Sequence, residues 1–178
     1  DARPRDITHV TPDHPHWPLV VMTVLTQLAV GAFTTIWLLQ LLGGSTHLDV
    51  AAITAFLVGG LALGASTLHL GRPAFAYRAL RMWRRSWLSR EVLLFSAFSG
   101  IAPAYAAMLW LDLPGSAIVG GLTVLLGIAG VTASACIYRV PSRPSWNTPY
   151  TLAQFLLTGA VLGPLLAAAL GVGRGPWL

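Results

Sequence analysis

The sequence predicts an all-α protein, a polytopic membrane helix bundle with about five transmembrane helices. Hydrophobic residues make up 55% of its 178 residues, and charged residues make up only 10%. Soluble domains carry about 25% charged residues, so a soluble domain of this size would lack most of its usual polar surface. Five apolar stretches are also long enough to cross a bilayer, because a spanning helix needs about 20 residues.

The five expected spans have no charge in their middles. They cover about residues 17–42, 50–70, 91–111, 117–138 and 149–172. Residues 1–16 form a polar N-terminal tail, residues 17–172 form the transmembrane bundle, and residues 173–178 form a C-terminal tail.

Glycine recurs within two of these spans, at positions that we expect to pack against other helices. The glycines are Gly59, Gly60 and Gly64 in the second span and Gly120, Gly121, Gly127 and Gly130 in the fourth. Small residues let helix backbones approach closely in lipid, where the hydrophobic effect does not drive helices together.

Arginine is unevenly distributed between the connections and predicts their sidedness. Lysine is absent, so all 11 basic residues are arginines, and the net charge is +5. Segment 71–90 carries six arginines and segment 138–148 carries two, whereas segments 43–49 and 112–116 carry none. The positive-inside rule then puts the N-terminal tail and both basic connections in the cytoplasm. We expect a multi-pass protein of a bacterial or archaeal inner (cytoplasmic) membrane.

Two residues at the edges of spans could carry chemistry. His69 closes the second span and Glu91 opens the third, so both should lie near the same membrane surface. Imidazole and carboxylate can hydrogen-bond the hydroxyls of a quinol and accept its protons. A structural alternative stays open, in which the histidine bonds a helix-end carbonyl and the glutamate is favoured by a helix N-terminus.

The histidine and cysteine positions argue against haem and metal in this protein. A membrane b-type haem usually needs two axial histidines within the bundle. His16 precedes the first span and His47 lies on the opposite face, so His69 has no partner at a useful depth. The single cysteine, Cys136, excludes an internal disulfide and a cysteine-based zinc or iron–sulfur site.

Ion transport is poorly supported as a function. Intramembrane charges would mark a conduction path, but the span interiors offer only Gln27, Gln40, Gln154 and scattered hydroxyls. We expect these glutamines to make hydrogen bonds between helices.

The basic connection 71–90 has two interpretations, a topology signal or a surface on which a partner subunit docks. Tryptophan and arginine are enriched at interface hot spots, and both residue types alternate here. The candidate docking residues in this connection are Arg81, Arg84, Arg85 and Trp87, and those in connection 138–148 are Tyr138 and Trp146. Within connection 71–90, Ser86 or Ser89 is expected to cap the N-terminus of the third span.

Several motifs, taken in order, point to a known family. They are Trp17-Pro-Leu-Val20, Thr26-Gln-Leu-Ala-Val-Gly31, His69-Leu-Gly-Arg-Pro73, Ser86-Trp-Leu-Ser-Arg-Glu91, Ile137-Tyr-Arg-Val-Pro141 and Pro144-Ser-Trp-Asn147. Spread over nearly the whole sequence, they resemble the membrane-anchor subunit family of dimethyl sulfoxide reductase (DmsC-like), which belongs to molybdopterin oxidoreductase complexes.

The resemblance implies a haem-free anchor that binds a quinol, with menaquinone as the expected quinone. Such an anchor exchanges electrons with an iron–sulfur cluster subunit, which works beside a molybdopterin catalytic subunit. The family's quinol-site residues match His69, Gly71 and Glu91, and we add Arg72 and Arg90 by proximity. The protein would not act on the terminal substrate, and the partners expected besides these subunits are lipids, not nucleic acid.

Three questions stay open at this point. The family commonly has more spans than the five counted here, and tail 1–16 could be the end of a fused or processed iron–sulfur domain. Relatives are known on both faces of the membrane, and electrons could flow toward or from the quinone. The alternative functions are a purely structural anchor without a quinol site and a small polytopic transporter.

Overall fold

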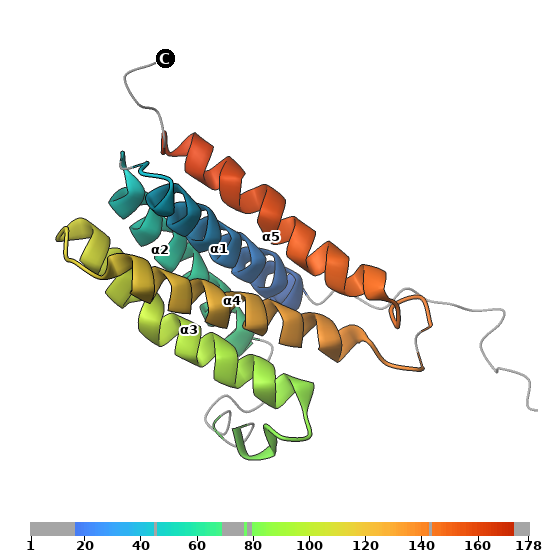
Figure 1. The fold of residues 1–178 in the computed structure, drawn as a ribbon. Coiled ribbons are helices and arrows are strands. Elements are labelled where there is room, and N and C mark those ends of the chain that lie inside the picture. Colours follow the sequence, from blue (N-terminus) through green and yellow to red (C-terminus); the bar gives the residue numbers. More distant parts are fainter. Residues whose placement is uncertain (1–16, 45, 69–76, 78–79, 143, 173–178) are drawn as a thin grey trace, which may run out of the picture.

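The protein is an all-helical bundle, as the sequence predicts (Figure 1). The computed structural model describes residues 17–44, 46–68, 77, 80–142 and 144–172. The helices are α1 (Trp17–Leu41), α2 (Leu48–Leu68), α3 (Trp87–Trp110), α4 (Ser116–Tyr138) and α5 (Pro149–Ala169). Each is long and apolar enough to cross a membrane. With 21 to 25 residues apiece, they extend about 30 to 38 Å.

The main difference from the predicted spans lies at the start of α3. This helix begins at Trp87, four residues before the predicted start at Glu91. Ser86 is its N-cap, and the Ser86 hydroxyl accepts a hydrogen bond from the backbone N–H of Ser89 (3.4 Å). Ser89 itself is a buried residue within the first turn. Hydropathy missed this turn because Arg90 and Glu91 interrupt the apolar pattern.

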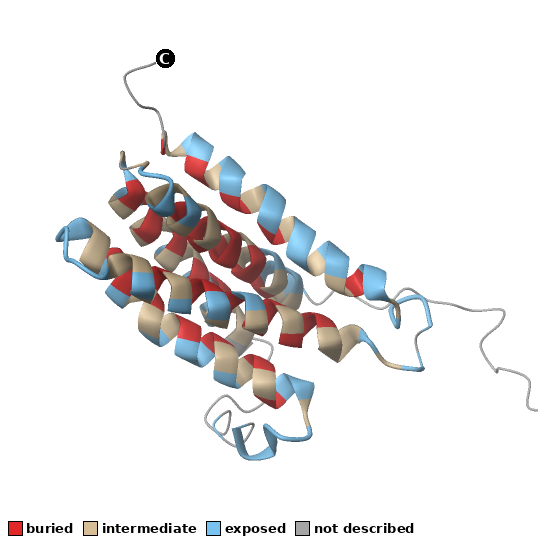
Figure 2. Ribbon diagram, viewed as in Figure 1, coloured by how far each residue is buried: buried red, intermediate tan, exposed pale blue. Residues whose placement is uncertain are grey.

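Helix α1 lies at the centre of the bundle (Figure 1). It packs against α2, α4 and α5, while α3 packs against α2 and α4. Half of the spanning segment of α1 is buried, whereas only 17% of that of α5 is. Figure 2 shows the same contrast, with exposed residues along much of α5. Helix α5 is therefore held mainly by its contact with α1.

That contact is a direct approach of two backbones at glycines. A Cβ atom added to Gly31 on α1 would run into the carbonyl oxygen of Gly159 on α5. A Cβ on Gly163 would meet the backbone of Gly31 in the same way. In α4, Gly127 and Gly130 make room for Val30 of α1 and Phe95 of α3. These α4 positions confirm the expected packing role, but a Cβ atom added to Gly60 or Gly64 of α2 would meet nothing within 4 Å among the described residues.

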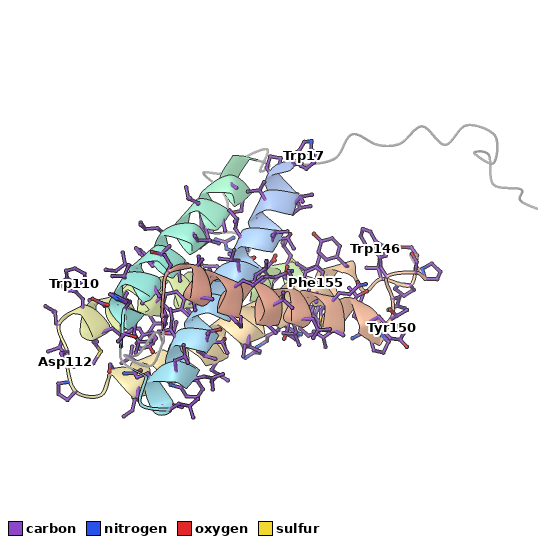
Figure 3. The ribbon with its side chains drawn as sticks, turned by 90° about the horizontal axis from the view of Figure 1, so that it is seen from above. Trp17, Trp110, Asp112, Trp146, Tyr150 and Phe155 are labelled. Atoms are coloured by element: carbon purple, nitrogen blue, oxygen red, sulfur yellow. The ribbon has the colours of Figure 1, made fainter. Side chains whose placement is uncertain are left out.

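The two ends of the bundle differ in charge. Helices α1, α3 and α5 begin, and α2 and α4 end, at one end, which we call the basic end. The described arginines lie there: Arg81, Arg84, Arg85, Arg90 and Arg139. Figure 3 shows Trp146 and Tyr150 at the basic end and Trp110 with Asp112 at the other. Exposed aromatic residues at both ends are typical of a membrane interface.

A polar network ties three helices together at the end opposite the basic end. The Tyr105 hydroxyl of α3 donates to Gln40 Oε1 of α1 (2.9 Å), and Gln40 Nε2 donates to the Ser116 hydroxyl of α4 (2.7 Å). The Trp37 indole of α1 donates to the Ala117 carbonyl (2.8 Å). Gln40 therefore makes the interhelical hydrogen bonds that the sequence predicted for it.

Gly31→Ala should destabilise the bundle by about 1–3 kcal/mol, because the new methyl group collides with the α5 backbone. The free energy of unfolding in mixed micelles measures this loss. Gly100→Ala on α3 is the matched control, since a Cβ there meets nothing within 4 Å. Equal stability of the two variants would contradict the close α1–α5 contact.

Tyr105→Phe and Gln40→Leu should show coupled effects on stability. Both remove the same hydrogen bond between α1 and α3. A double-mutant cycle should give a coupling energy of about 1 kcal/mol, in the range found for hydrogen bonds between membrane helices. Thr158→Val serves as a control, because the Thr158 hydroxyl donates to the Gln154 carbonyl of its own helix (2.8 Å). Additive effects of Tyr105→Phe and Gln40→Leu would exclude the network as a stabilising element.

Candidate functional site

Glu91 is the only buried carboxylate among the described residues. It lies in the second turn of α3 at the basic end, and its side chain is 5% exposed. The Ser134 hydroxyl of α4 donates a hydrogen bond to it. A charged group inside a membrane bundle is costly and is usually retained for function. The burial of Glu91 therefore makes it the first candidate for chemistry.

Tyr138 extends this polar cluster toward α1. It lies four residues after Ser134, on the same face of α4. The Tyr138 hydroxyl is hydrogen-bonded to Thr23 of α1 and interacts electrostatically with Glu91. Because the Thr23 hydroxyl gives its own proton to the Leu19 carbonyl (2.8 Å), its oxygen is the acceptor for Tyr138. Glu91, Ser134, Tyr138 and Thr23 thus connect α3, α4 and α1.

A cavity lies on the other side of Glu91. Its volume is about 230 Å³, and α1, α2 and α3 supply its walls. Glu91, Ser66 and Ser96 provide the polar atoms, and the apolar walls include Met22 and Phe95. A cavity with one carboxylate, two hydroxyls and apolar walls is suited to a small ring that carries hydroxyl groups.

Three predicted quinol-site residues, His69, Gly71 and Arg72, lie outside the described residues. Arg90 is described, but its side chain points away from the Glu91 cavity. Its guanidinium donates to the carbonyls of Trp83 and Arg84 (2.9 Å each) and lies 4.3 Å from the ring centroid of Trp87. Arg90 lines a separate cavity on the α3–α4 surface, of about 430 Å³. The structure therefore does not bring the side chains of Arg90 and Glu91 together.

Most of the predicted docking residues lie on the surface of the basic end. Arg81, Arg84 and Arg85 are exposed, and Trp87 and Trp146 are each more than two-fifths exposed. Tyr138 differs, because it is half-buried and its hydroxyl points between helices. Within the described ranges, no three His, Cys, Asp or Glu side chains gather into a group that could hold a metal ion.

Sequence reasoning missed Ser134, Thr23 and Ser66 as neighbours of the site. The spacing of Ser134 and Tyr138 is the signal that could have indicated a shared polar face on α4. Thr23 and Ser66 carry no comparable signal, because hydroxyl residues are scattered through all five spans.

Comparisons with known proteins agree with this architecture. The family model described as "DMSO reductase anchor subunit (DmsC)" matches residues 11–175. A sulfite dehydrogenase subunit of Allochromatium vinosum is 34% identical, over 88% of this protein and 55% of the relative. The anaerobic dimethyl sulfoxide reductase protein YnfH of Escherichia coli is 30% identical, over 86% of this protein and 57% of the relative. An anaerobic dimethyl sulfoxide reductase protein of Haemophilus influenzae is 32% identical, over 86% of this protein and 57% of the relative.

The protein thus spans about half the length of the curated relatives it matches. No solved structure matches it. The family match extends over nearly all of its residues, and five apolar helices fit a membrane anchor. This protein belongs to the family of DMSO reductase anchor subunits.

Proposed function

We propose that this protein binds a quinol at the basic end and exchanges its electrons with an iron–sulfur subunit of a molybdopterin oxidoreductase. The observation that carries the proposal is the buried carboxylate of Glu91, which borders a cavity between α1, α2 and α3. Family membership supports the anchoring role, and the relatives' names supply the class of complex. The alternative is an anchor without a quinol site.

The chemistry of the cavity suits a quinol head group. Oxidation of a quinol to a quinone releases two electrons and two protons. In the proposed site, Glu91 accepts one proton, and the Ser134 hydroxyl stabilises the carboxylate before that transfer. The electrons pass to the iron–sulfur partner, and the apolar walls around Met22 and Phe95 hold the ring.

His69 completes the proposed site on the evidence of the sequence. Ser66 lines the cavity and precedes His69 by three residues. We propose that the His69 imidazole bonds the second quinol hydroxyl and accepts its proton. Gly71 and Arg72 belong to the same segment, and menaquinone is the proposed quinone.

The exposed arginines and tryptophans of the basic end form the proposed docking surface. Arg84 lies 5.3 Å from the ring centroid of Trp83, and Arg90 stacks on Trp87, so both tryptophan rings are held in place at the surface. We propose that an iron–sulfur subunit docks on these residues, which puts its nearest cluster at the quinol end of the bundle. The basic loops are proposed to be cytoplasmic, in an inner membrane.

Glu91→Gln should lower quinol-dependent turnover of the purified complex by about 10²-fold or more, the usual contribution of a positioned proton acceptor. His69→Ala should act in the same direction. The Asp49→Asn control changes the acidic residue in the first turn of α2, at the other end of the bundle, and should leave turnover unchanged. Normal turnover in Glu91→Gln would remove this residue from the mechanism and favour a purely structural anchor.

Trp87→Ala should weaken binding of the iron–sulfur subunit by about 2 kcal/mol, as expected for a hot-spot tryptophan. Quantitative copurification or a binding titration in detergent measures the change. Trp110→Ala is the control, because Trp110 is 60% exposed at the opposite end of the bundle. If both variants retain the partner equally, the docking surface lies elsewhere.

A further inference from the structure

A groove between α1 and α5 lies beside the polar cluster at the basic end. Its volume is about 470 Å³, and its walls include Thr23, Tyr138, Trp146, Gln154 and Phe155. Figure 3 shows Trp146 near the start of α5 and Phe155 further along that helix. Val20 and Val24 of α1 also line the groove and are 46% and 40% exposed, so it opens toward the lipid.

The groove continues along α1 and α5 toward the middle of the bundle. A second cavity of about 380 Å³ shares Phe155 with it and extends to Leu38 and Pro164. Gly31 and Gly159 line this second cavity, so it follows the close contact between the two helices. The two cavities adjoin at Phe155, and we call them together the α1–α5 trench; the lining of its far part is almost entirely apolar.

The head of the trench offers an amide that needs a partner. Gln154 is exposed in the second turn of α5, where an amide facing hydrocarbon is costly unless it is hydrogen-bonded. The nearby hydroxyl protons are already used, because Thr151 donates to the Trp146 carbonyl (2.7 Å) and Thr23 donates to the Leu19 carbonyl (2.8 Å). An occupant with a neutral polar head would satisfy Gln154.

Aromatic rings surround the same head region. The Tyr138 ring centroid lies 5.4 Å from that of Trp146 and 5.5 Å from that of Phe155. Clustered rings favour contact with another flat ring, through stacked or edge-to-face packing. A flat, uncharged, hydrogen-bonding head on a long apolar tail describes an isoprenoid quinol better than a phospholipid, whose head carries a charged phosphate.

Tyr138 connects the trench with the proposed chemistry. Tyr138 lines the groove, its hydroxyl is hydrogen-bonded to Thr23, and it interacts electrostatically with Glu91. We infer that the α1–α5 trench is a lateral access site for the isoprenoid quinol, which holds the head beside Tyr138 and Gln154 and the tail along α5 before the head enters the Glu91 cavity. This inference rests on the proposed quinol function.

Steady-state kinetics of the intact complex, with a long-tailed menaquinol and with tail-less menadiol, test the inference. Ala160→Phe fills the tail part of the trench, since Ala160 lines the second cavity. We expect the KM for the long-tailed menaquinol to rise about tenfold and the KM for menadiol to stay within about twofold, with kcat unchanged. Val161→Phe is the control, because Val161 is the next residue on α5, is 57% exposed and does not line the trench.

A second measurement compares the quinone and phospholipid retained by each purified variant. Ala160→Phe should lower the retained quinone and leave phospholipid unchanged. Loss of phospholipid alone, or equal long-tailed KM values in Ala160→Phe and Val161→Phe, would overturn the inference. If Glu91→Gln still abolishes turnover in that case, the proposed quinol function stands without the trench. If Glu91→Gln turns over normally while Ala160→Phe loses quinone, the trench stands and the Glu91 chemistry fails.

Discussion

The arrangement of this bundle depends on the backbone contact between α1 and α5 at Gly31, Gly159 and Gly163. In lipid, the tails are as apolar as the side chains, so helices are held by close packing and by hydrogen bonds between them. Glycines allow α5 to touch the central helix at one region, and the remainder of α5 stays largely exposed. Because α5 is anchored at the glycines, open space remains on either side of that contact. The trench beside Tyr138 and its deeper continuation are direct consequences.

The buried polar groups form two clusters, one at each end of the bundle, and the clusters differ in how fully their members are hydrogen-bonded to one another. At the end opposite the basic end, Tyr105, Gln40 and Ser116 satisfy one another and hold α1, α3 and α4 together. At the basic end, Glu91 has a hydroxyl partner on one side and a cavity on the other. A carboxylate that one serine hydrogen-bonds in a bundle interior adds little to the stability of the fold, since the burial of its charge costs free energy. The first cluster is therefore structural, and the second is where chemistry is expected.

The sequence predicted the helices closely but could not predict how they pair. Hydropathy identified five spans, because the lipid requires long uninterrupted apolar segments, and its largest error is at the start of α3, where the charged pair Arg90–Glu91 interrupts the pattern. The central place of α1 was not predictable, since apolar residues cover all sides of each helix and no polar face indicates its orientation. The sequence predicted Glu91 as a site residue, but its partner Ser134 and the inward hydroxyl of Tyr138 depend on which helices meet. The separation of Arg90 from Glu91 follows from the turn of about 100° between successive helical residues.

The names of the relatives raise the question of how one kind of anchor serves both a dehydrogenase and reductases. Those it matches at similar identity are named as parts of a sulfite dehydrogenase and of dimethyl sulfoxide reductases. In the proposed mechanism, a carboxylate that accepts a proton from a quinol returns a proton to a quinone when electrons flow the other way. The same hydrogen bonds of Glu91 and the same trench then serve both directions. The direction follows from the reduction potentials of the quinone and of the partner's substrate, because the free energy of electron transfer depends on their difference. In this proposal the anchor fixes where the quinol meets its partner, and the partner fixes which way the electrons go.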